Sequence, residues 1–205
     1  MKLFTTLTSP YGRIARIVII ERGLSERVSI EVPVTRQPDS PYYKVNPSGR
    51  VPYLQLDEHS GFEESALICR YLDHLDGASL YEPPANKQGW ELRRLEAMAR
   101  SMLDGIGVWG REYLYRPEEL RSARIIAHEH ARADRLVRHF DQLVGSQWLG
   151  YDSDTLNMAQ ILLCATLHGR EGSPPGFSWS RDCPRLADWV TKMGERESIA
   201  STTPP

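Results

Sequence analysis

The hydrophobic pattern of this chain changes its period near Gly77, and this change limits the fold more than any other feature. Before Gly77, short runs with strand-like alternation are separated by turn residues and by helix-length segments. After it, apolar residues recur every three or four positions over long stretches, which is typical of amphipathic helices. We therefore expect a small α/β domain at 1–77, a proline-containing linker at 78–87 and an all-helical domain at 88–205.

Strands and helices alternate in the first predicted domain. Serine is a favoured N-cap residue and proline is favoured at the first helical position, so the first helix is expected to begin at Pro10 after Ser9. The predicted order is a strand at 1–6, a helix ending at Gly23, a strand at 27–34, an irregular crossover at 35–49 with about one helical turn, a hairpin at 51–64 turning at 57–61, and a helix at 65–77. This order is β-α-β-α-β-β-α.

The second half is predicted to contain four helices, at 88–115, 117–144, 156–169 and 184–196, before a loose tail at 201–205. The third of these is apolar on most faces, which indicates a buried central helix. Asn157 at its start and Gln160 three residues later form a variant of the capping box, in which each side chain satisfies a backbone N–H group of the first turn.

Composition and charge narrow the class of protein. The 205 residues carry a formal net charge of -2, so there is no basic footprint for a nucleic acid or an anionic membrane. Apolar runs are too short for a membrane-spanning helix. The three cysteines are scattered, which fits neither a disulfide framework nor a metal site and favours a cytoplasmic location. We expect Cys69 and Cys164 in the core and Cys183, beside a proline, at the surface.

The segment NPSGRVPYL, residues 46–54, places Pro52 where a strand is expected to begin. Proline removes a donor from the strand ladder, so it normally occupies an edge, a strand start or a bulge. Two interpretations follow from the residues alone. Either Pro52 is a trans proline at the start of a strand, or the backbone there is shaped for a ligand.

Three motifs together resemble a known family. An SPY stretch follows the first strand, NPSGRVPYL precedes the third, and EESALICRYL opens the third helix, all ahead of a helical domain. In this combination and order the chain resembles the cytosolic glutathione S-transferases of the bacterial type. The resemblance implies a thioredoxin-like N-terminal domain and glutathione as co-substrate, with no metal. One departure is Gln160, where the family often has an acidic residue.

The resemblance also implies how glutathione would be held. A cis bond before Pro52 would turn the backbone N–H and C=O of Val51 outward to pair with the cysteinyl part, as an added strand. Glu64 and Ser65, at a helix N-terminus, would receive the γ-glutamyl carboxylate. Arg50 would contact the glycyl carboxylate. The alternative interpretations are that Ser65 only caps its helix and that Arg50 is an ordinary solvated side chain.

Thiolate chemistry needs a group that stabilises the sulfur anion, because a thiol with a pKa near 8.5 is mostly protonated at neutral pH. Ser9 is the candidate catalytic residue, since its hydroxyl lies at the end of the first strand and the start of the first helix. Other hydroxyl donors lie nearby, namely Thr5, Thr6, Thr8 and Tyr11. The alternative for Ser9 is a helix cap with no part in catalysis.

The resemblance leaves the reaction open among several glutathione-dependent steps. No cysteine lies in residues 5–11, so the mixed-disulfide chemistry of cysteine-bearing relatives is not expected. Conjugation of a small hydrophobic electrophile, with a role in detoxification, is the default, and peroxide reduction, isomerisation and dehalogenation are alternatives. Residues that could line the acceptor pocket, or simply belong to the core, are Tyr11, Met102, Trp109 and Tyr113.

Members of the family associate as two-fold dimers, so we expect a homodimer. The sequence also allows a second class of function. A chain could keep this fold as a non-catalytic binding or regulatory protein. Retention of Ser9, the Val51-Pro52 step and the Glu64-Ser65 pair favours the enzyme.

Overall fold

The computed structural model describes residues 1–151 and 154–205. Contacts divide the chain into two compact units, one of Met1–Glu82 with Glu197–Pro205 and the other of Pro83–Arg196. The first is a thioredoxin-like sheet with helices and the second is helical, so the predicted fold class is confirmed. The sequence pattern assigned all of 88–205 to the helical domain, whereas these contacts group its last nine residues, 197–205, with the sheet.

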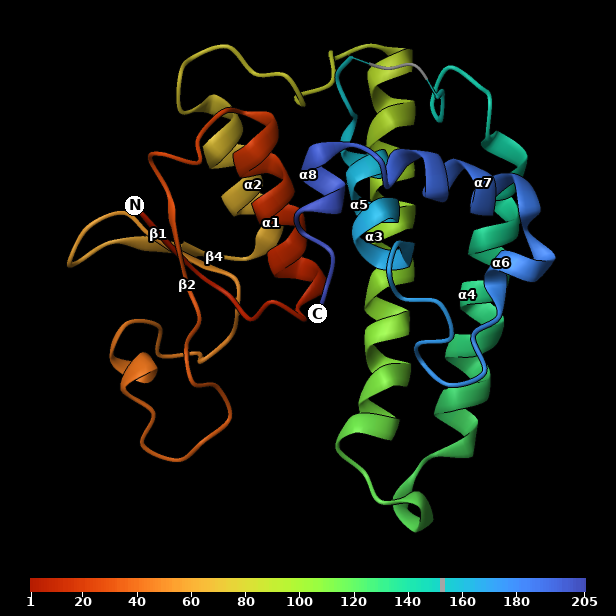
Figure 1. Ribbon diagram of the computed structural model, residues 1–205, viewed down its shortest axis with the longest axis horizontal. Helices are drawn as coiled ribbons and strands as arrows, with labels where there is room; N and C mark the ends of the chain where they lie inside the picture. Colours follow the sequence, from red (N-terminus) through yellow and green to blue (C-terminus); the bar gives the residue numbers. More distant parts are fainter. Residues whose placement is uncertain (152–153) are drawn as a thin grey trace. The chain divides into compact units, whose positions relative to one another are not determined.

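A four-stranded sheet forms the centre of the first unit (Figure 1). Its strands are β1 (Lys2–Phe4), β2 (Ser29–Glu31), β3 (Tyr53–Gln55) and β4 (Gly61–Glu63). They lie in the order β2-β1-β3-β4, with β1 and β2 parallel and the other two pairs antiparallel. Leu3 and Leu54 pair across the two central strands and are fully buried, whereas Ile30 on the edge strand is 40% exposed.

Three helices and one 3-10 turn complete this unit. Helix α1 (Pro10–Glu21) begins after Ser9 as predicted, and α2 (Ser65–His74) packs against it. The crossover holds one 3-10 turn, η1 (Pro41–Lys44). Helix α8 (Glu197–Ala200), near the C-terminus, also lies against α1 (Figure 1).

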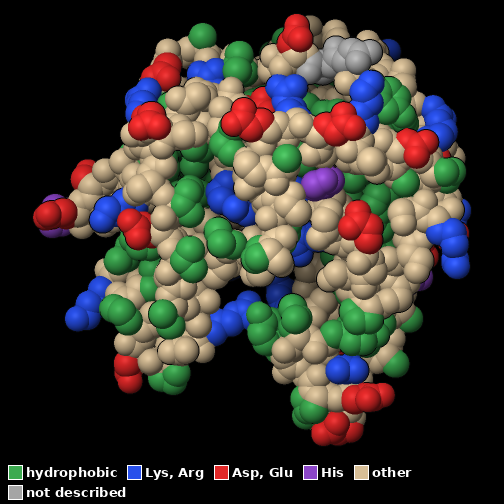
Figure 2. All heavy atoms as spheres, viewed as in Figure 1, with side chains coloured by type: hydrophobic (Ala, Val, Ile, Leu, Met, Phe, Trp, Pro, Cys, Tyr) green, Lys and Arg blue, Asp and Glu red, His purple; other side chains and the backbone are tan. Residues whose placement is uncertain are grey.

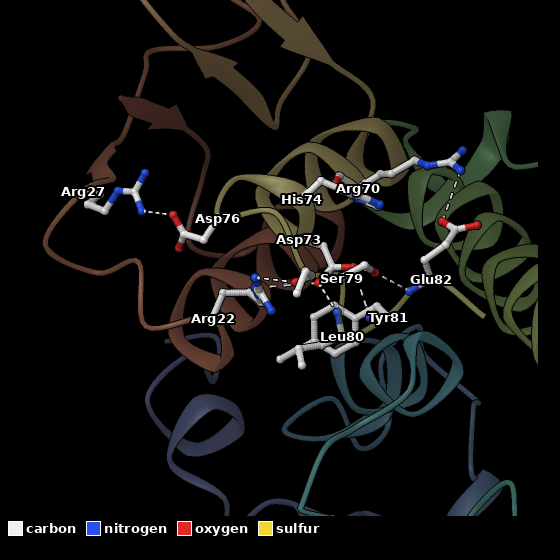
Figure 3. Close-up of polar contacts among 11 residues, drawn as sticks. Arg22, Arg27, Arg70, Asp73, His74, Asp76, Ser79, Leu80, Tyr81 and Glu82 are labelled. Carbon is white, nitrogen blue, oxygen red and sulfur yellow. Dashed lines mark hydrogen bonds and ion pairs between the residues drawn. The ribbon is translucent and has the colours of Figure 1, made fainter. Parts of the chain in front are cut away.

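The end of α2 is fixed to the following segment by the carboxylate of Asp73, which is 2% exposed (Figure 3). This carboxylate accepts hydrogen bonds from the hydroxyl of Ser79 and from the backbone N–H groups of Leu80 and Tyr81, the latter two at 2.9 and 3.1 Å. The guanidinium of Arg22, from the end of α1, lies 3.7 Å away. A single buried carboxylate therefore ties both helices to residues 79–81.

The C-terminal tail does not follow its prediction. Residues 201–205 were expected to be loose, but Thr202 is 2% exposed. Two arginines of α1 hold this segment: Arg13 donates to the carbonyl of Ile199 at 3.1 Å, and Arg16 donates to the carbonyl of Thr202 at 3.0 Å. The tail was mispredicted because its partners lie more than 180 residues away in the sequence, where no local pattern shows them.

The second unit is built on α3 (Lys87–Leu114), which packs against α4 (Ala123–Leu143) and α5 (Met158–Leu167). Helix α5 is buried, and both hydrogen bonds of its predicted Asn157–Gln160 capping box are present. Helix α7 (Pro184–Met193) is the predicted fourth helix. The sequence did not predict the 3-10 turn η2 (Glu118–Leu120) before α4 or the short α6 (Trp179–Asp182) before α7.

The surface carries both signs of charge. Figure 2 shows acidic and basic side chains interspersed over the face that it draws. In the described parts of the chain no helix is both long and apolar enough to cross a membrane. Cys69 and Cys164 are buried as predicted, but Cys183 is also buried, at 1% exposed. It lies between α6 and α7, both of which pack against α4.

Candidate functional site

Three segments that the sequence analysis singled out leave the sheet at one end. Phe4, the last residue of β1, pairs with Tyr53, the first of β3, and Tyr53 pairs with Glu63, the last of β4. The segment with Ser9 follows β1, the Val51–Pro52 step precedes β3, and Glu64 follows β4. The antiparallel register thus brings the segment with the Ser9 hydroxyl, the backbone of the Val51–Pro52 step and a helix N-terminus to the same end of the sheet.

Ser9 is the N-cap of α1. Its hydroxyl oxygen accepts a hydrogen bond from the backbone N–H of Gly12 at 3.1 Å, and its own N–H closes a tight turn onto the carbonyl of Thr6 at 3.1 Å. Within the described residues the hydroxyl proton of Ser9 has no acceptor. Ser9 therefore keeps a donor available at the positive end of a helix, and it is only half-buried.

Thr5, one of the other hydroxyl donors near Ser9, is buried and cannot reach a ligand. Thr5 is 0% exposed, and its hydroxyl donates to the carbonyl of Thr6 at 3.1 Å. It also lies where a side chain at residue 12 would be, since a Cβ added to Gly12 would come within 1.7 Å of the Thr5 Oγ1. Thr6 and Tyr11 are half-buried and Thr8 is exposed, so these three are not closed off in this way.

The segment before β3 presents the backbone of Val51. The Val51–Pro52 peptide bond is cis, as the resemblance implies. The carbonyl of Arg50, just before this bond, accepts hydrogen bonds from the Tyr42 hydroxyl at 2.6 Å and from the Asn46 amide at 3.0 Å. The backbone N–H and C=O of Val51, by contrast, make no hydrogen bond to the described residues. Burial is the main cause that raises the pKa of Tyr42 to about 12, so this hydroxyl stays a donor at neutral pH.

A carboxylate that the sequence analysis missed connects this loop to β4. Glu63 accepts hydrogen bonds from the Asn46 amide at 2.9 Å and from the Ser48 hydroxyl. These bonds, the Ser48 bond foremost, together with the nearby Arg50 guanidinium, hold the pKa of Glu63 below its usual range against the opposing effect of burial. The signal available in the sequence was the NPSG turn, where Asn46 also accepts from the backbone N–H of Ser48.

The N-terminus of α2 is capped by Glu64 and not by Ser65, so the alternative interpretation of Ser65 as the cap is wrong. The Glu64 carboxylate accepts from the backbone N–H groups of Ala66 at 3.0 Å and Leu67 at 3.3 Å, and from the hydroxyl of Ser65 at 3.2 Å. Glu64 has a φ of 82°, which places its carboxylate over the first turn. The helix N-terminus therefore already holds one carboxylate, which is the kind of group that glutathione would bring.

Of the residues expected to line an acceptor pocket, Tyr11 belongs to the first unit and the other three belong to the second. Tyr11 is half-buried on α1. On α3, Met102 and Trp109 are each 1% exposed, and the Trp109 ring contacts Phe177 edge-on at a centroid distance of 5.5 Å. Tyr113 is half-buried beneath the guanidinium of Arg121, 4.7 Å from the ring centre. Arg50, by contrast, has an exposed side chain, so it is available to a ligand or to solvent.

Comparison with known proteins identifies the family of the chain. Residues 3–83 match the family described as glutathione S-transferase, N-terminal domain. The GST-like protein YibF of Escherichia coli K12 is 30% identical over 100% of this chain and 99% of its own. Maleylacetoacetate isomerase of Pseudomonas aeruginosa is 27% identical over 83% of this chain and 82% of its own. The chain therefore belongs to the glutathione S-transferase family.

Solved structures agree with the fold as well. The crystal structure of a glutathione S-transferase from Methylobacillus flagellatus with glutathione bound has a TM-score of 0.84 to this chain and is 28% identical to it. The match covers 100% of this chain and 99% of that one. Both units of the chain, and not the sheet alone, therefore have counterparts in that protein.

Proposed function

We propose that this protein is a glutathione transferase that stabilises the glutathione thiolate with Ser9 and directs it at a small hydrophobic electrophile. The observation that carries the proposal is the hydroxyl of Ser9, which accepts from Gly12 and keeps its proton for another partner. The sulfur would form a bond to the electrophilic carbon, and the leaving group would depart with the bonding electrons. Glutathione is the co-substrate, and the bound glutathione of the Methylobacillus flagellatus protein supports its choice.

The binding roles follow from the three segments at the end of the sheet. The backbone of Val51 beside Pro52, which makes no hydrogen bond to the described residues, would pair with the cysteinyl part of glutathione as an added strand. Ser65 and the first turn of α2 would take the γ-glutamyl carboxylate, and the carboxylate of Glu64 would turn from its capping position toward the α-amino group. Arg50 would pair with the glycyl carboxylate at the open side of the loop.

A single hydrogen bond from Ser9 is strong enough to lower the pKa of the glutathione thiol by the amount that catalysis needs. A hydrogen bond to a charged partner contributes about 1.5–3 kcal/mol. At about 1.36 kcal/mol for each pKa unit, one such bond lowers a thiol pKa by roughly one to two units, enough to make the thiolate a major species near neutral pH. The positive end of α1 adds to this in the same direction.

For the acceptor we propose the aromatic and apolar residues assigned from the sequence, Tyr11 on α1 and Met102, Trp109 and Tyr113 on α3. The half-buried rings of Tyr11 and Tyr113 are the two best suited to meet a ligand, because Met102 and Trp109 are almost fully covered. We further propose a cytoplasmic homodimer that acts in detoxification. Light scattering at micromolar concentration tests the assembly, and a monomer would contradict it.

Two measurements test the proposed function together. The wild-type chain should be retained on immobilised glutathione and eluted by free glutathione, and it should conjugate glutathione to a generic aryl halide. Ser9→Ala should keep most of the retention, because Val51, Glu64 and Ser65 would supply the binding, but should lose about ten- to a hundredfold in kcat/KM. Retention without any turnover would favour the non-catalytic alternative.

A second candidate is glutathione-dependent isomerisation, favoured by the 27% identity to a maleylacetoacetate isomerase over most of both chains. In that reaction the thiolate would add to the double bond of the substrate and leave again after rotation, so glutathione is not consumed. Incubation with maleylacetoacetate separates the two candidates. Isomerised product with no loss of glutathione supports the isomerase, and stable conjugates of other electrophiles support the transferase.

A further inference from the structure

The turn that leads into α1 and ends at Ser9 is held by Arg16, a buried arginine of that helix. Arg16 is 9% exposed, and its Nη2 donates to the carbonyl of Leu7 at 3.2 Å and to the carbonyl of Thr202 at 3.0 Å. Leu7 lies inside the turn that the N–H of Ser9 closes onto Thr6. One guanidinium nitrogen thus joins the middle of the Ser9 turn to the C-terminal segment.

The spacing along α1 explains how Arg16 reaches that turn. Ser9 and Arg16 are seven positions apart, about two helical turns, which places them on one face of the helix. Helical side chains point back toward the N-terminus, so the long side chain of Arg16 extends toward the segment before α1. The hydrogen bond to Leu7 is therefore a consequence of the sequence spacing.

The charge of Arg16 is not neutralised by a nearby acid. Among residues 1–151 and 154–205 no carboxylate forms an ion pair with Arg16, and its Nε has no hydrogen-bond partner. Burial alone lowers the pKa of its guanidinium, which nevertheless remains a cation. Within the described residues its hydrogen-bond partners are thus carbonyl oxygens, and its positive charge adds to that of the α1 N-terminus.

The C-terminal segment to which Arg16 binds is itself held by several hydrogen bonds. Thr202 is 2% exposed, and its hydroxyl donates to the carbonyl of Ser198 at 2.7 Å. Arg13, which is fully buried, donates to the carbonyl of Ile199, and the hydroxyl of Ser198 donates to Glu21 on α1. These bonds fix residues 198–202 along α1, so the carbonyl that Arg16 holds is itself fixed.

We propose that Arg16 is a positioning residue for Ser9, and that the C-terminal segment 197–205 is part of the catalytic support through it. By holding the Leu7 carbonyl and the Thr202 carbonyl at once, Arg16 fixes the turn from which the Ser9 hydroxyl reaches the glutathione sulfur. Its uncompensated charge favours the thiolate in addition. This inference rests on the proposed function, because it assigns Arg16 a role toward the thiolate that Ser9 is proposed to stabilise.

The test is the pKa of the glutathione thiol in the complex, followed by thiolate absorbance against pH. Arg16→Met keeps a long unbranched side chain but removes the charge and both donors, and it should raise this pKa by about half to one unit. At neutral pH kcat/KM should fall about three- to tenfold, and the loss should vanish well above the thiol pKa, where the thiolate forms without help. A merely structural loss would lower the rate equally at every pH.

Arg22→Met is the matched control, because Arg22 is a largely buried arginine at the other end of α1 that donates to the carbonyl of Ala78. It should lower the melting temperature but leave the thiol pKa where it was. Should Arg16→Met not fold, Arg16→Lys decides. A lysine keeps the positive charge but lacks the planar guanidinium whose Nη2 reaches both carbonyls, so it should raise the thiol pKa by a smaller amount.

The outcomes separate the two proposals. A moved pKa in Ser9→Ala with an unmoved one in the folded Arg16 variants overturns the role of Arg16 alone. An equal shift in Arg22→Met and Arg16→Met overturns it too, because the effect would then be general destabilisation. An unmoved pKa in Ser9→Ala overturns the proposed function, and the role of Arg16 with it.

Discussion

Replacement of Asp73 should be among the most destabilising single changes in the first unit. Its carboxylate is 2% exposed and accepts from Ser79, Leu80 and Tyr81, with Arg22 at 3.7 Å. In Asp73→Ala the buried backbone N–H of Tyr81, the part-buried N–H of Leu80 and the guanidinium of Arg22 would lose this partner, and each buried donor left unsatisfied costs about 1–3 kcal/mol. Breaking a buried charged pair costs about 3–5 kcal/mol in total, which is the loss we expect in the free energy of unfolding.

The assay for this prediction is urea unfolding of the full chain, with Asp76→Ala as its control. Asp76 pairs with Arg27 near the same end of α2 (Figure 3), but the two side chains are 49% and 47% exposed, so this pair should contribute only about 0–1 kcal/mol. Asp73→Ala should lower the unfolding midpoint strongly with little change in the slope. A loss below about 1 kcal/mol, or one equal to that of Asp76→Ala, would refute the reasoning from burial.

Two further changes test the packing and charge around the site. Gly12→Ala should destabilise the chain by about 1–3 kcal/mol, because its Cβ would come within 1.7 Å of the buried Thr5 Oγ1. Thermal unfolding measures this loss of stability, and adding Thr5→Ala to the same chain should restore part of it. A Gly12→Ala variant as stable as wild type would contradict this packing. The pKa of Glu63 is lowered in the folded state, so its hydrogen bonds from Ser48 and Asn46 stabilise the fold fully when the pH is above the ordinary pKa of a glutamate. This stabilisation is lost as the pH falls through the lowered pKa. Wild-type and Glu63→Gln should therefore differ most in stability near neutral pH and converge in acid, and a difference that stays constant from neutral pH to pH about 3 would show that the Glu63 charge is not involved.

Local chemistry made much of this fold predictable from the sequence. The serine before Pro10 caps α1, and the Asn157–Gln160 capping box opens α5, because a cap depends on residues within one turn of each other. The cis bond at Val51–Pro52 could not come from such rules, and only the resemblance of NPSGRVPYL to a family implied it.

The parts that were missed depend on contacts between distant residues. Glu63 reaches Asn46, and Arg16 reaches Thr202 across most of the chain, and neither contact leaves a periodic signal. At the start of α2 serine is the favoured N-cap residue by type, but the chain caps the helix with Glu64, which has a φ of 82° and accepts from the N–H groups of Ala66 and Leu67. Sequence spacing alone does not report that backbone angle.

The most direct test of the central claim is the pKa of the thiol of bound glutathione, measured by thiolate absorbance in wild-type and Ser9→Ala. Thr6→Val and Tyr11→Phe serve as controls, because both remove a nearby hydroxyl that packing leaves accessible. We expect Ser9→Ala to raise the thiol pKa by roughly one to two units and the controls to leave it unchanged. An unmoved pKa in Ser9→Ala, with a raised one in either control, would contradict the account and assign the thiolate to that neighbouring hydroxyl.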